Sequence, residues 1–306
     1  MEIGIVILNY LNWTDTVECI ESLKSQTNQS FQIVVVDNAS TNESFTELEN
    51  CYESVDTIHL LQTENNLGFA KGNNVGIVYC QKILNINNVL VINNDVIFTD
   101  TGYIDYLINF NIGTDIGVVG TKIIGADGEN QNPLYFNPSL KAVFREFSIP
   151  LLRNFHLDGI LKIGRAFKQV RNKNESSFSL PSGRAPYILH GSALFLTENY
   201  LSKVAGLYPE TFLYYEEEIL GLVCKKLGLR MLYTDKIEIF HKEDQSSKMS
   251  FQNLEQTKFK FARRSVRTGL KVSILSTSKT IYVINSQSYT FIKSKMGQIK
   301  KYTFQA

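Results

Sequence analysis

The sequence of 306 residues contains no long apolar run of the kind that a membrane-spanning helix needs, which is about 18 residues. A cationic leader is also lacking, because the chain opens directly on the apolar run Ile3–Leu8. These two absences argue against a secreted or membrane-spanning protein. We therefore expect a cytoplasmic protein, with the inner face of the plasma membrane as its other predicted location.

Two glycine-rich phosphate motifs are absent as well. Neither the G-x-G-x-x-G fingerprint of dinucleotide-binding proteins nor the G-x-x-x-x-G-K-[ST] loop of nucleoside triphosphatases occurs. Cysteines are few and scattered: Cys19, Cys51, Cys80 and Cys224 lack the spacing of metal ligands. We expect them to be buried or partly buried free thiols.

Acidic residues are missing from the C-terminal part of the chain. Residues 258–306 hold 11 Lys and Arg and no Asp or Glu, so residues 1–257 hold 31 − 11 = 20 basic against 30 acidic residues. The first part therefore carries a net charge of −10 and the second +11. Such a division favours a negatively charged partner for the basic part.

Strand and helix patterns alternate through the first half of the chain. Apolar runs typical of buried parallel strands occur at Ile3–Leu8, Ile33–Val36, Thr57–Leu61, Val89–Ile92 and Ile116–Val119. Strand-like segments return at Met231–Tyr233 and Ile237–Phe240. This order predicts an α/β fold, a mostly parallel, doubly wound sheet with helices on both faces.

Polar side chains follow four of these runs at the points where the strands end. They are Asn9, Asp37, Asn66 and Asp95. In open α/β sheets ligands bind beyond the carboxyl ends of the strands, so the four side chains are expected at the rim of one site.

The periodicity fails between residues 125 and 185, which predicts long loops around short helices. We divide the chain into a catalytic domain, 1–245, and a basic, helical extension, 246–306. Within the domain, residues 1–120 hold the alternating strand and helix patterns, and residues 121–245 form a second half.

Three groups of residues carry plausible chemistry. Asp37 could accept hydrogen bonds from a base or a ribose, and Asn66–Asn74 places glycines and Lys71 where a loop turns into a helix that could face phosphates. Asp95, after Asn93 and Asn94, and His241 are candidate ligands for Mn²⁺ or Mg²⁺.

The third group is acidic. Glu216, Glu217 and Glu218 follow Tyr214 and Tyr215 and open a helix that otherwise looks buried. Acids at a helix N-terminus also suit the helix dipole. Adjacent carboxylates raise one another's pKa, and one of them could deprotonate an attacking sugar hydroxyl as general base.

Together these segments resemble the family 2 glycosyltransferases, most closely the branch with rhamnosyltransferases and galactofuranosyltransferases of surface polysaccharides. The segments that carry the resemblance are Ile5–Tyr10, Val35–Ser40, Asn66–Asn74, Asn93–Asp95, Leu189–Phe195 and Gly206–Glu217. The resemblance implies a GT-A fold and inverting transfer from a UDP- or dTDP-sugar to a hydroxyl of a growing, lipid-linked surface glycan. It also implies that residues 1–120 form the half that binds the nucleotide sugar and 121–245 the half that binds the acceptor.

The resemblance also implies roles for individual residues. Asp37 matches the residue that holds the base, Asp95 the last acid of the metal motif, and Glu217 the catalytic base, with Glu216 and Glu218 left open as alternatives. The predicted nucleotide-sugar site comprises Asn9, Tyr10, Asp37, Asn38, Asn66, Gly68, Phe69, Lys71, Asn74, Asn93 and Asn94. The predicted acceptor side comprises His190, Gly191, Ser192, Tyr214 and Tyr215.

Both acidic motifs depart from the family pattern, since the metal motif reads Asn-Asn-Asp and the base motif Glu-Glu. A sugar-phosphate nucleotidyltransferase and a non-catalytic protein that binds nucleotides or glycans therefore remain alternatives. The nucleotidyltransferase would need a glycine-rich, basic N-terminal loop that this sequence lacks.

The basic residues of 258–271 recur every three or four positions beside an apolar stripe, which predicts an amphipathic helix. It could contact an anionic membrane surface or pack on the main domain with its charged face in solvent. Nucleic acid is not expected as a partner, and a homodimer remains open.

Overall fold

The computed structural model describes residues 1–134, 188–243, 254–295 and 297–306, so most of the loop region expected at 125–185 lies outside the described residues. The strands are β1 (Ile3–Asn9), β2 (Phe31–Asp37), β3 (Ile58–Thr63), β4 (Val89–Asn93), β5 (Val96–Ile97), β6 (Ile116–Gly125), β7 (Ala193–Leu196), β8 (Arg230–His241), β9 (Ser288–Lys295) and β10 (Gln298–Gln305). The helices are α1 (Trp13–Lys24), α2 (Ser44–Tyr52), α3 (Gly68–Lys82), α4 (Tyr103–Asn109), α7 (Glu198–Leu201), α8 (Glu216–Lys226), α10 (Leu254–Ile274) and α11 (Thr277–Asn285).

All the described strands belong to one sheet, in the order β10-β9-β3-β2-β1-β4-β7-β6-β8-β5. The pairings from β3 to β4 and between β6 and β8 are parallel, as predicted. The remaining five are antiparallel. Strand β7 runs against both β4 and β6, β5 runs against β8, and β9 runs against both β3 and β10. The fold is α/β as expected, but the sheet is mixed beyond its central strands.

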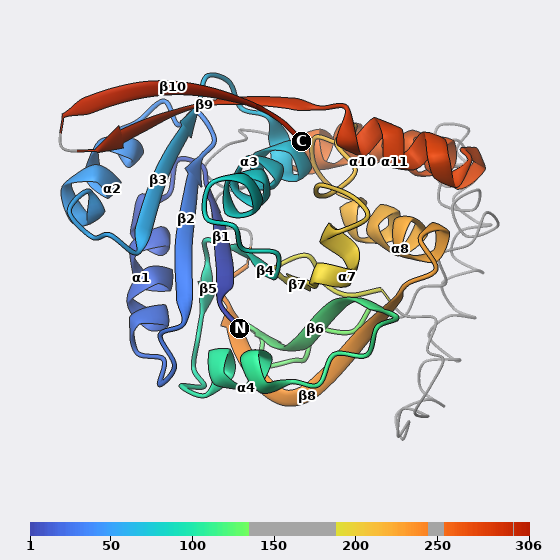
Figure 1. Ribbon diagram of the computed structural model, residues 1–306, viewed down its shortest axis with the longest axis horizontal. Coiled ribbons are helices and arrows are strands. Elements are labelled where there is room, and N and C mark those ends of the chain that lie inside the picture. The colour runs from blue at the N-terminus through green and yellow to red at the C-terminus, as the bar shows by residue number, and fades with distance from the viewer. Residues whose placement is uncertain (135–187, 244–253, 296) are drawn as a thin grey trace.

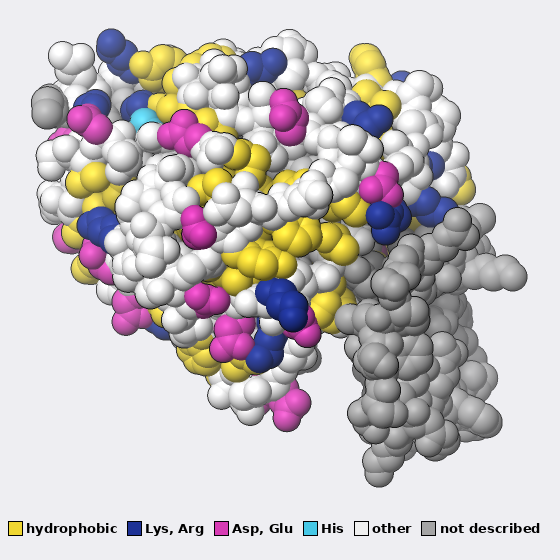
Figure 2. Space-filling view, turned by 60° about the horizontal axis from the view of Figure 1, so that its bottom comes forward, with side chains coloured by type: hydrophobic (Ala, Val, Ile, Leu, Met, Phe, Trp, Pro, Cys, Tyr) yellow, Lys and Arg dark blue, Asp and Glu magenta, His cyan; other side chains and the backbone are white. Residues whose placement is uncertain are grey.

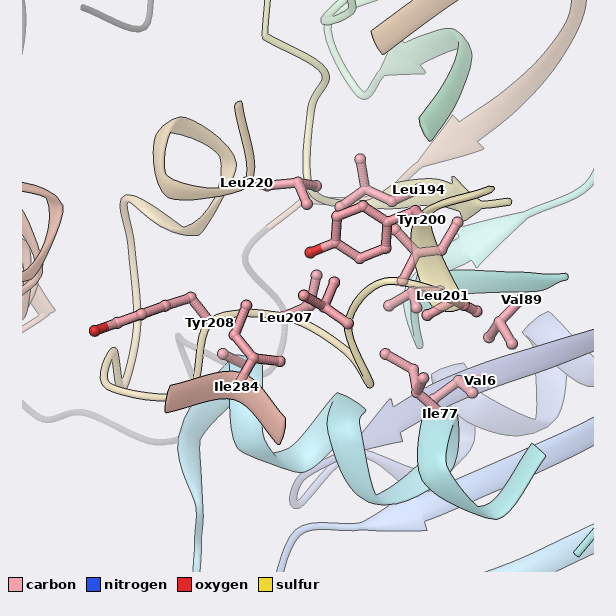
Figure 3. Close-up of a cluster of buried hydrophobic side chains, with 14 of the residues drawn as sticks. Val6, Ile77, Val89, Leu194, Tyr200, Leu201, Leu207, Tyr208, Leu220 and Ile284 are labelled. Atoms are coloured by element: carbon pink, nitrogen blue, oxygen red, sulfur yellow. The ribbon is translucent and has the colours of Figure 1, made fainter. Parts of the chain in front are cut away.

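The continuous apolar runs of the central strands reflect burial on both faces of the sheet. Ile5 and Ile7 of β1 point into one core with α1, α2 and α4, whereas Val6 points into the other. That second core includes α3, α7, α8, α10 and α11. Figure 3 shows part of it, with side chains from β1 (Val6), α3 (Ile77) and α7 (Tyr200).

The C-terminal part of the chain returns to the side of the sheet where β3 lies and adds β9 and β10 beyond it (Figure 1). Helix α10 packs on α8, and β9 then pairs with β3 so that Leu61 lies opposite Lys293. The basic extension is thus helical up to Asn285, whereas residues 288–295 and 298–305, whose structure the sequence pattern leaves open, form strands. Tyr289 and Phe291 of β9 are buried, which explains why this segment forms a strand rather than a helix.

The cysteines are free, and Cys19, Cys80 and Cys224 are buried as expected. Cys51 is exposed on α2, so the expectation of burial is wrong for this residue. Within the described part of the chain, no helix combines the length and the apolar character required to cross a bilayer. Acidic and basic side chains are interspersed on the face presented in Figure 2.

Candidate functional site

A cavity of about 460 Å³ opens where β1 and β4 end. Most of the predicted site residues line it: Tyr10, Asn38, Asn66, Gly68, Phe69, Asn93, Asn94, Asp95, His190, Gly191, Ser192, Tyr214, Tyr215, Glu216, Glu217, Glu218 and His241. The structure therefore brings the predicted metal ligands, the acidic cluster and the acceptor-side segment together around one space.

Four predicted residues do not line this cavity: Asn9, Asp37, Lys71 and Asn74. Asn9 and Asp37 are buried beneath it, where the Asn9 amide donates to Asp37 Oδ2 at 2.7 Å. The other oxygen of Asp37 accepts from the backbone N–H of Ser40 at 3.0 Å. Both side chains thus connect the ends of β1 and β2. The sequence pattern had predicted that these two side chains bind the nucleotide.

Asn74 is bonded within the core. Its amide donates to the Leu207 carbonyl and to the Tyr289 hydroxyl, both at 2.9 Å, and its carbonyl accepts from the Leu207 N–H at 2.7 Å. With its side chain used in this way, Asn74 holds α3 against β9. In this structure Asn74 therefore has a role in packing, and its predicted contact with the nucleotide stays a prediction.

The start of α3 also differs from the expectation of a phosphate-binding helix terminus. The N–H of Phe69 donates to the Phe212 carbonyl at 2.7 Å, so it does not face the cavity as a free donor. Gly68 has φ +76°, and a Cβ there would lie 2.3 Å from the same carbonyl oxygen. The glycine is required by this close approach of two backbone segments.

Asp95 and His241 lie side by side because β5 and β8 pair so that Val96 is opposite His241. Asp95 Oδ1 is 3.3 Å from His241 Nε2, and the two side chains are 6% and 7% exposed. Neither of these two atoms has a hydrogen-bond partner within the described part of the chain. The other ring nitrogen, Nδ1, is 2.9 Å from the side-chain amide oxygen of Gln131. Because that oxygen only accepts, Nδ1 must donate to it, and Nε2 of the neutral ring is then an acceptor.

Two acceptors that face each other in a buried place repel unless a cation or a proton lies between them. Among the described residues, no third His, Cys, Asp or Glu joins this pair to form a protein-only metal cage. A carboxylate and an imidazole that leave the other positions open suit Mn²⁺ or Mg²⁺ shared with substrate phosphates.

The acidic cluster is delivered into the cavity by an unusual turn. Tyr214 and Tyr215 have φ +69° and +75°, the left-handed region that side chains other than glycine rarely adopt. Strained backbone of this kind commonly occurs at functional sites, where the surrounding packing enforces it. Here Gly269 of α10 supports the turn, since a Cβ at Gly269 would lie 2.5 Å from the Tyr215 ring.

The carboxyl groups of the cluster differ in their surroundings. Burial, and then the charge of Glu217, raise the pKa of Glu216 to about 8. Burial also raises the pKa of Glu217, although its own N–H and that of Gly191 donate to its carboxylate and oppose this rise. A Cβ at Gly191 would lie 2.6 Å from Glu217 Oε1, so only glycine leaves room for this contact.

His190 faces His241 across the cavity wall, with ring centroids 5.5 Å apart in an edge-to-face arrangement. Its Nδ1 accepts from the backbone N–H of Ser192 at 3.2 Å, so Nε2 carries the hydrogen. Burial, followed by His241, lowers the pKa of His190 to about 4. His190 is therefore a neutral hydrogen-bond donor at physiological pH.

A sequence profile of glycosyl transferase family 2 matches residues 4–167. The chain belongs to glycosyl transferase family 2. This family differs from that of the sugar-phosphate nucleotidyltransferases considered as an alternative. Asp95 falls inside the matched range, whereas the acidic cluster and His241 fall beyond it.

A hexosyltransferase of low-salt glycan biosynthesis, Agl10 from Haloferax volcanii, is 26% identical over 216 residues. The match covers 71% of this chain and 59% of that protein, so the present glycosyltransferase spans a little over half of the relative's length.

Solved structures with the same fold include TarS from S. aureus in complex with UDP-GlcNAc, with a TM-score of 0.54 at 14% identity over 93% of this chain and 71% of that one. The mannosyltransferase PcManGT from Pyrobaculum calidifontis, solved with GDP-Man and Mn²⁺, gives a TM-score of 0.50 at 11% identity over 92% and 72% of the two chains. These similarities confirm the GT-A fold of this family 2 glycosyltransferase.

Several lining residues were not predicted. Leu8, Leu134, Phe212 and Leu213 supply apolar surface to the cavity, and Gln131 lies behind His241. Leu8 is the last residue of a predicted strand, so its position was visible in the pattern. Phe212 and Leu213 lie in Gly206–Glu217, one of the segments that carry the family resemblance, whereas Gln131 and Leu134 lie in an irregular segment without such a signal.

Proposed function

We propose that this glycosyltransferase is an inverting enzyme that transfers a sugar from a UDP- or dTDP-linked donor to a hydroxyl of a growing, lipid-linked surface glycan. The observation that carries the proposal is the pair of unpartnered acceptors, Asp95 Oδ1 and His241 Nε2, in the same cavity as Glu217. Such a transfer requires two groups, a divalent cation and a carboxylate that acts as a base and takes up a proton.

In the proposed arrangement Asp95 and His241 hold Mn²⁺ or Mg²⁺ against the donor diphosphate. Bound there, the cation would neutralise charge on the leaving diphosphate. The relative that makes hexosyl transfers and the neighbours solved with UDP-GlcNAc or with GDP-Man and Mn²⁺ support a nucleotide sugar as donor. His190, a neutral donor of hydrogen bonds, would orient the bound sugars without competing for the cation.

Glu217 is the proposed base among the three acids. Its carboxylate is oriented by the Gly191 N–H, and its raised pKa makes it a stronger base than an exposed carboxylate. Glu216, with a pKa of about 8, is protonated at neutral pH and suits a donor role instead. Attack by the activated hydroxyl opposite the leaving diphosphate inverts the anomeric configuration.

Two variants and a panel of donors test the proposal. UDP-, dTDP- and GDP-sugars are screened for thermal stabilisation with and without Mn²⁺, since a ligand of the folded state raises its stability. We expect one donor to stabilise the wild type only with the metal, and Asp95→Asn to abolish that dependence. Glu217→Gln should lower kcat by about 10²–10⁴-fold and leave the donor-induced shift unchanged.

Glu198→Gln, on α7 and away from the cavity, is the matched control and should transfer at the wild-type rate. Turnover of Glu217→Gln at the wild-type rate would exclude Glu217 as the base. A donor that binds tightly without any transfer or hydrolysis would favour a non-catalytic binding protein. The anomeric signal of the product in proton NMR decides between inversion and retention.

A further inference from the structure

The ring of His241 has a second neighbour outside the cavity. Gln131, which follows β6, places its carbonyl oxygen 2.9 Å from His241 Nδ1. The amide nitrogen of the same side chain donates to the carboxylate of Glu243, two residues after His241. The backbone N–H of Gln131 is itself bonded to the Ile123 carbonyl at 2.8 Å, which fixes this loop to β6.

The order of these groups leaves only one orientation of the amide. An ionised carboxylate can only accept hydrogen bonds, so the NH₂ of Gln131 must face Glu243 and the carbonyl must face His241. A carbonyl oxygen also only accepts, so His241 Nδ1 must carry the hydrogen. The lone pair of the neutral ring is then at Nε2, the atom that faces Asp95 Oδ1 at 3.3 Å.

The hydrogen-bonded chain from Glu243 through Gln131 to His241, here called the relay, is closely packed. A Cβ at Gly125 would lie 2.5 Å from both the Gln131 amide nitrogen and the Glu243 carboxylate oxygen. The edge of His190 closes the other side of the ring. Gly125 therefore makes room for the contact between Gln131 and Glu243, and the ring of His241 is held between this contact and the cavity.

We infer that Gln131 and Glu243 are positioning residues that set the tautomer of His241 and aim its Nε2 lone pair at the cation. The inference rests on the proposed function for the cation itself, but the tautomer is a property of the metal-free protein. Partners of this kind behind a metal-bound histidine change the metal affinity by about 10–100-fold when they are removed.

Three variants separate the relay from simple packing. Gln131→Leu keeps the size of the side chain and removes the acceptor. Glu243→Lys replaces the acceptor of the NH₂ group by a donor, which turns the amide round and presents its NH₂ to His241. Glu243→Gln is the matched control, since its own carbonyl can still accept from Gln131.

The first measurement is the tautomer of His241 by long-range ¹⁵N–¹H NMR without metal. We expect hydrogen on Nδ1 in the wild type and in Glu243→Gln, and on Nε2 in Glu243→Lys. The second is the affinity for Mn²⁺ in the presence of UDP, read from the electron paramagnetic resonance of free Mn²⁺. Gln131→Leu and Glu243→Lys should bind Mn²⁺ about 10–100-fold more weakly than Glu243→Gln.

Hydrogen on Nε2 in the wild type would overturn the inference, as would a Gln131→Leu variant that is folded and binds Mn²⁺ as tightly as Glu243→Gln. A wild type with the Nδ1–H tautomer that binds no Mn²⁺ with UDP would instead remove the proposed cation site and leave the tautomer assignment standing. Melting temperatures of the three variants identify any loss of affinity that comes from unfolding.

Discussion

Glu216 is a carboxyl group whose ionisation the fold opposes. Burial and the neighbouring charge of Glu217 raise its pKa from an ordinary 4.5 to about 8. Between these two values the folded protein binds a proton that the unfolded chain has lost, so the stability that this proton contributes is complete below about pH 4.5 and is lost as the pH rises to 8.

Glu216→Gln is neutral at every pH and escapes this loss. The free energy of unfolding of this variant, relative to the wild type, should therefore increase from pH 5 to pH 8. Urea unfolding of both proteins at pH 5, 6.5 and 8 measures the difference, with Glu198→Gln as the exposed acidic control. A difference that stays the same across the range would contradict the raised pKa.

At the scale of single residues, the sequence predicted Asp95 and His241 correctly as neighbours because both end strands, and strand ends converge at one edge. Asp37 also ends a strand, but its carboxylate bonds the Asn9 amide and the Ser40 N–H rather than lining the cavity. A polar residue after a strand can turn toward a ligand or toward the backbone of the next loop, and the pattern is identical in both cases. Gln131 lies in a loop where no periodicity marks it.

The start of α8 depends on a contact between elements rather than on its own sequence. The Gly191 N–H, in the segment before β7, bonds the Glu217 carboxylate, and the space of a methyl group there is already taken by Glu217 Oε1. The Glu217 carboxylate therefore connects the start of α8 to the segment before β7.

Gly191→Ala should displace that carboxylate with little effect on the rest of the fold. A shift of about 1 Å at a reacting group costs about 10²-fold in rate, so we expect a fall of kcat of that order. Steady-state kinetics and the melting temperature are measured together. Gly102→Ala is the control, because its Cβ would meet only Asp100 Oδ1 at 3.4 Å, and its kcat should equal that of the wild type.

Among the elements, the central strands were predicted within one or two residues because burial on both faces makes their sequences continuously apolar. The hairpin β9–β10 was left undecided between strand and helix although Tyr289 and Phe291, and again Tyr302 and Phe304, alternate with polar residues. Half-buried strands at the edge of a sheet carry a weak signal. Which distant strand they join depends on packing that a local pattern does not contain.

For the whole molecule, the basic C-terminal part is joined to the rest of the protein. Val266 and Val272 of α10 are buried in the core shared with α8, while Lys260, Arg264 and Arg267 are exposed. The apolar face of this helix is therefore occupied by the protein. Any contact of α10 with a membrane would depend on charge rather than on insertion.

We propose that this charged face binds anionic bilayers. Sedimentation with vesicles that contain phosphatidylserine should show binding that falls with added salt, because each basic residue near such a surface contributes about 1 kcal/mol. The triple variant Lys260→Glu, Arg264→Glu and Arg267→Glu should lose binding by at least about tenfold. The double variant Lys82→Glu and Lys203→Glu, which removes exposed charges elsewhere, should not; equal losses would refute a role specific to α10.

The pairing of β9 with β3 has a consequence for the nascent chain. The Lys293 side chain contacts Tyr79 of α3, 214 positions earlier, so the outer edge of β3 stays without its neighbour until β9 has been synthesised. An open strand edge is a template for pairing with other chains. A chain whose synthesis stops before residue 288 would thus keep the edge of β3 exposed and able to pair with other chains. Folding factors would have to cover that edge.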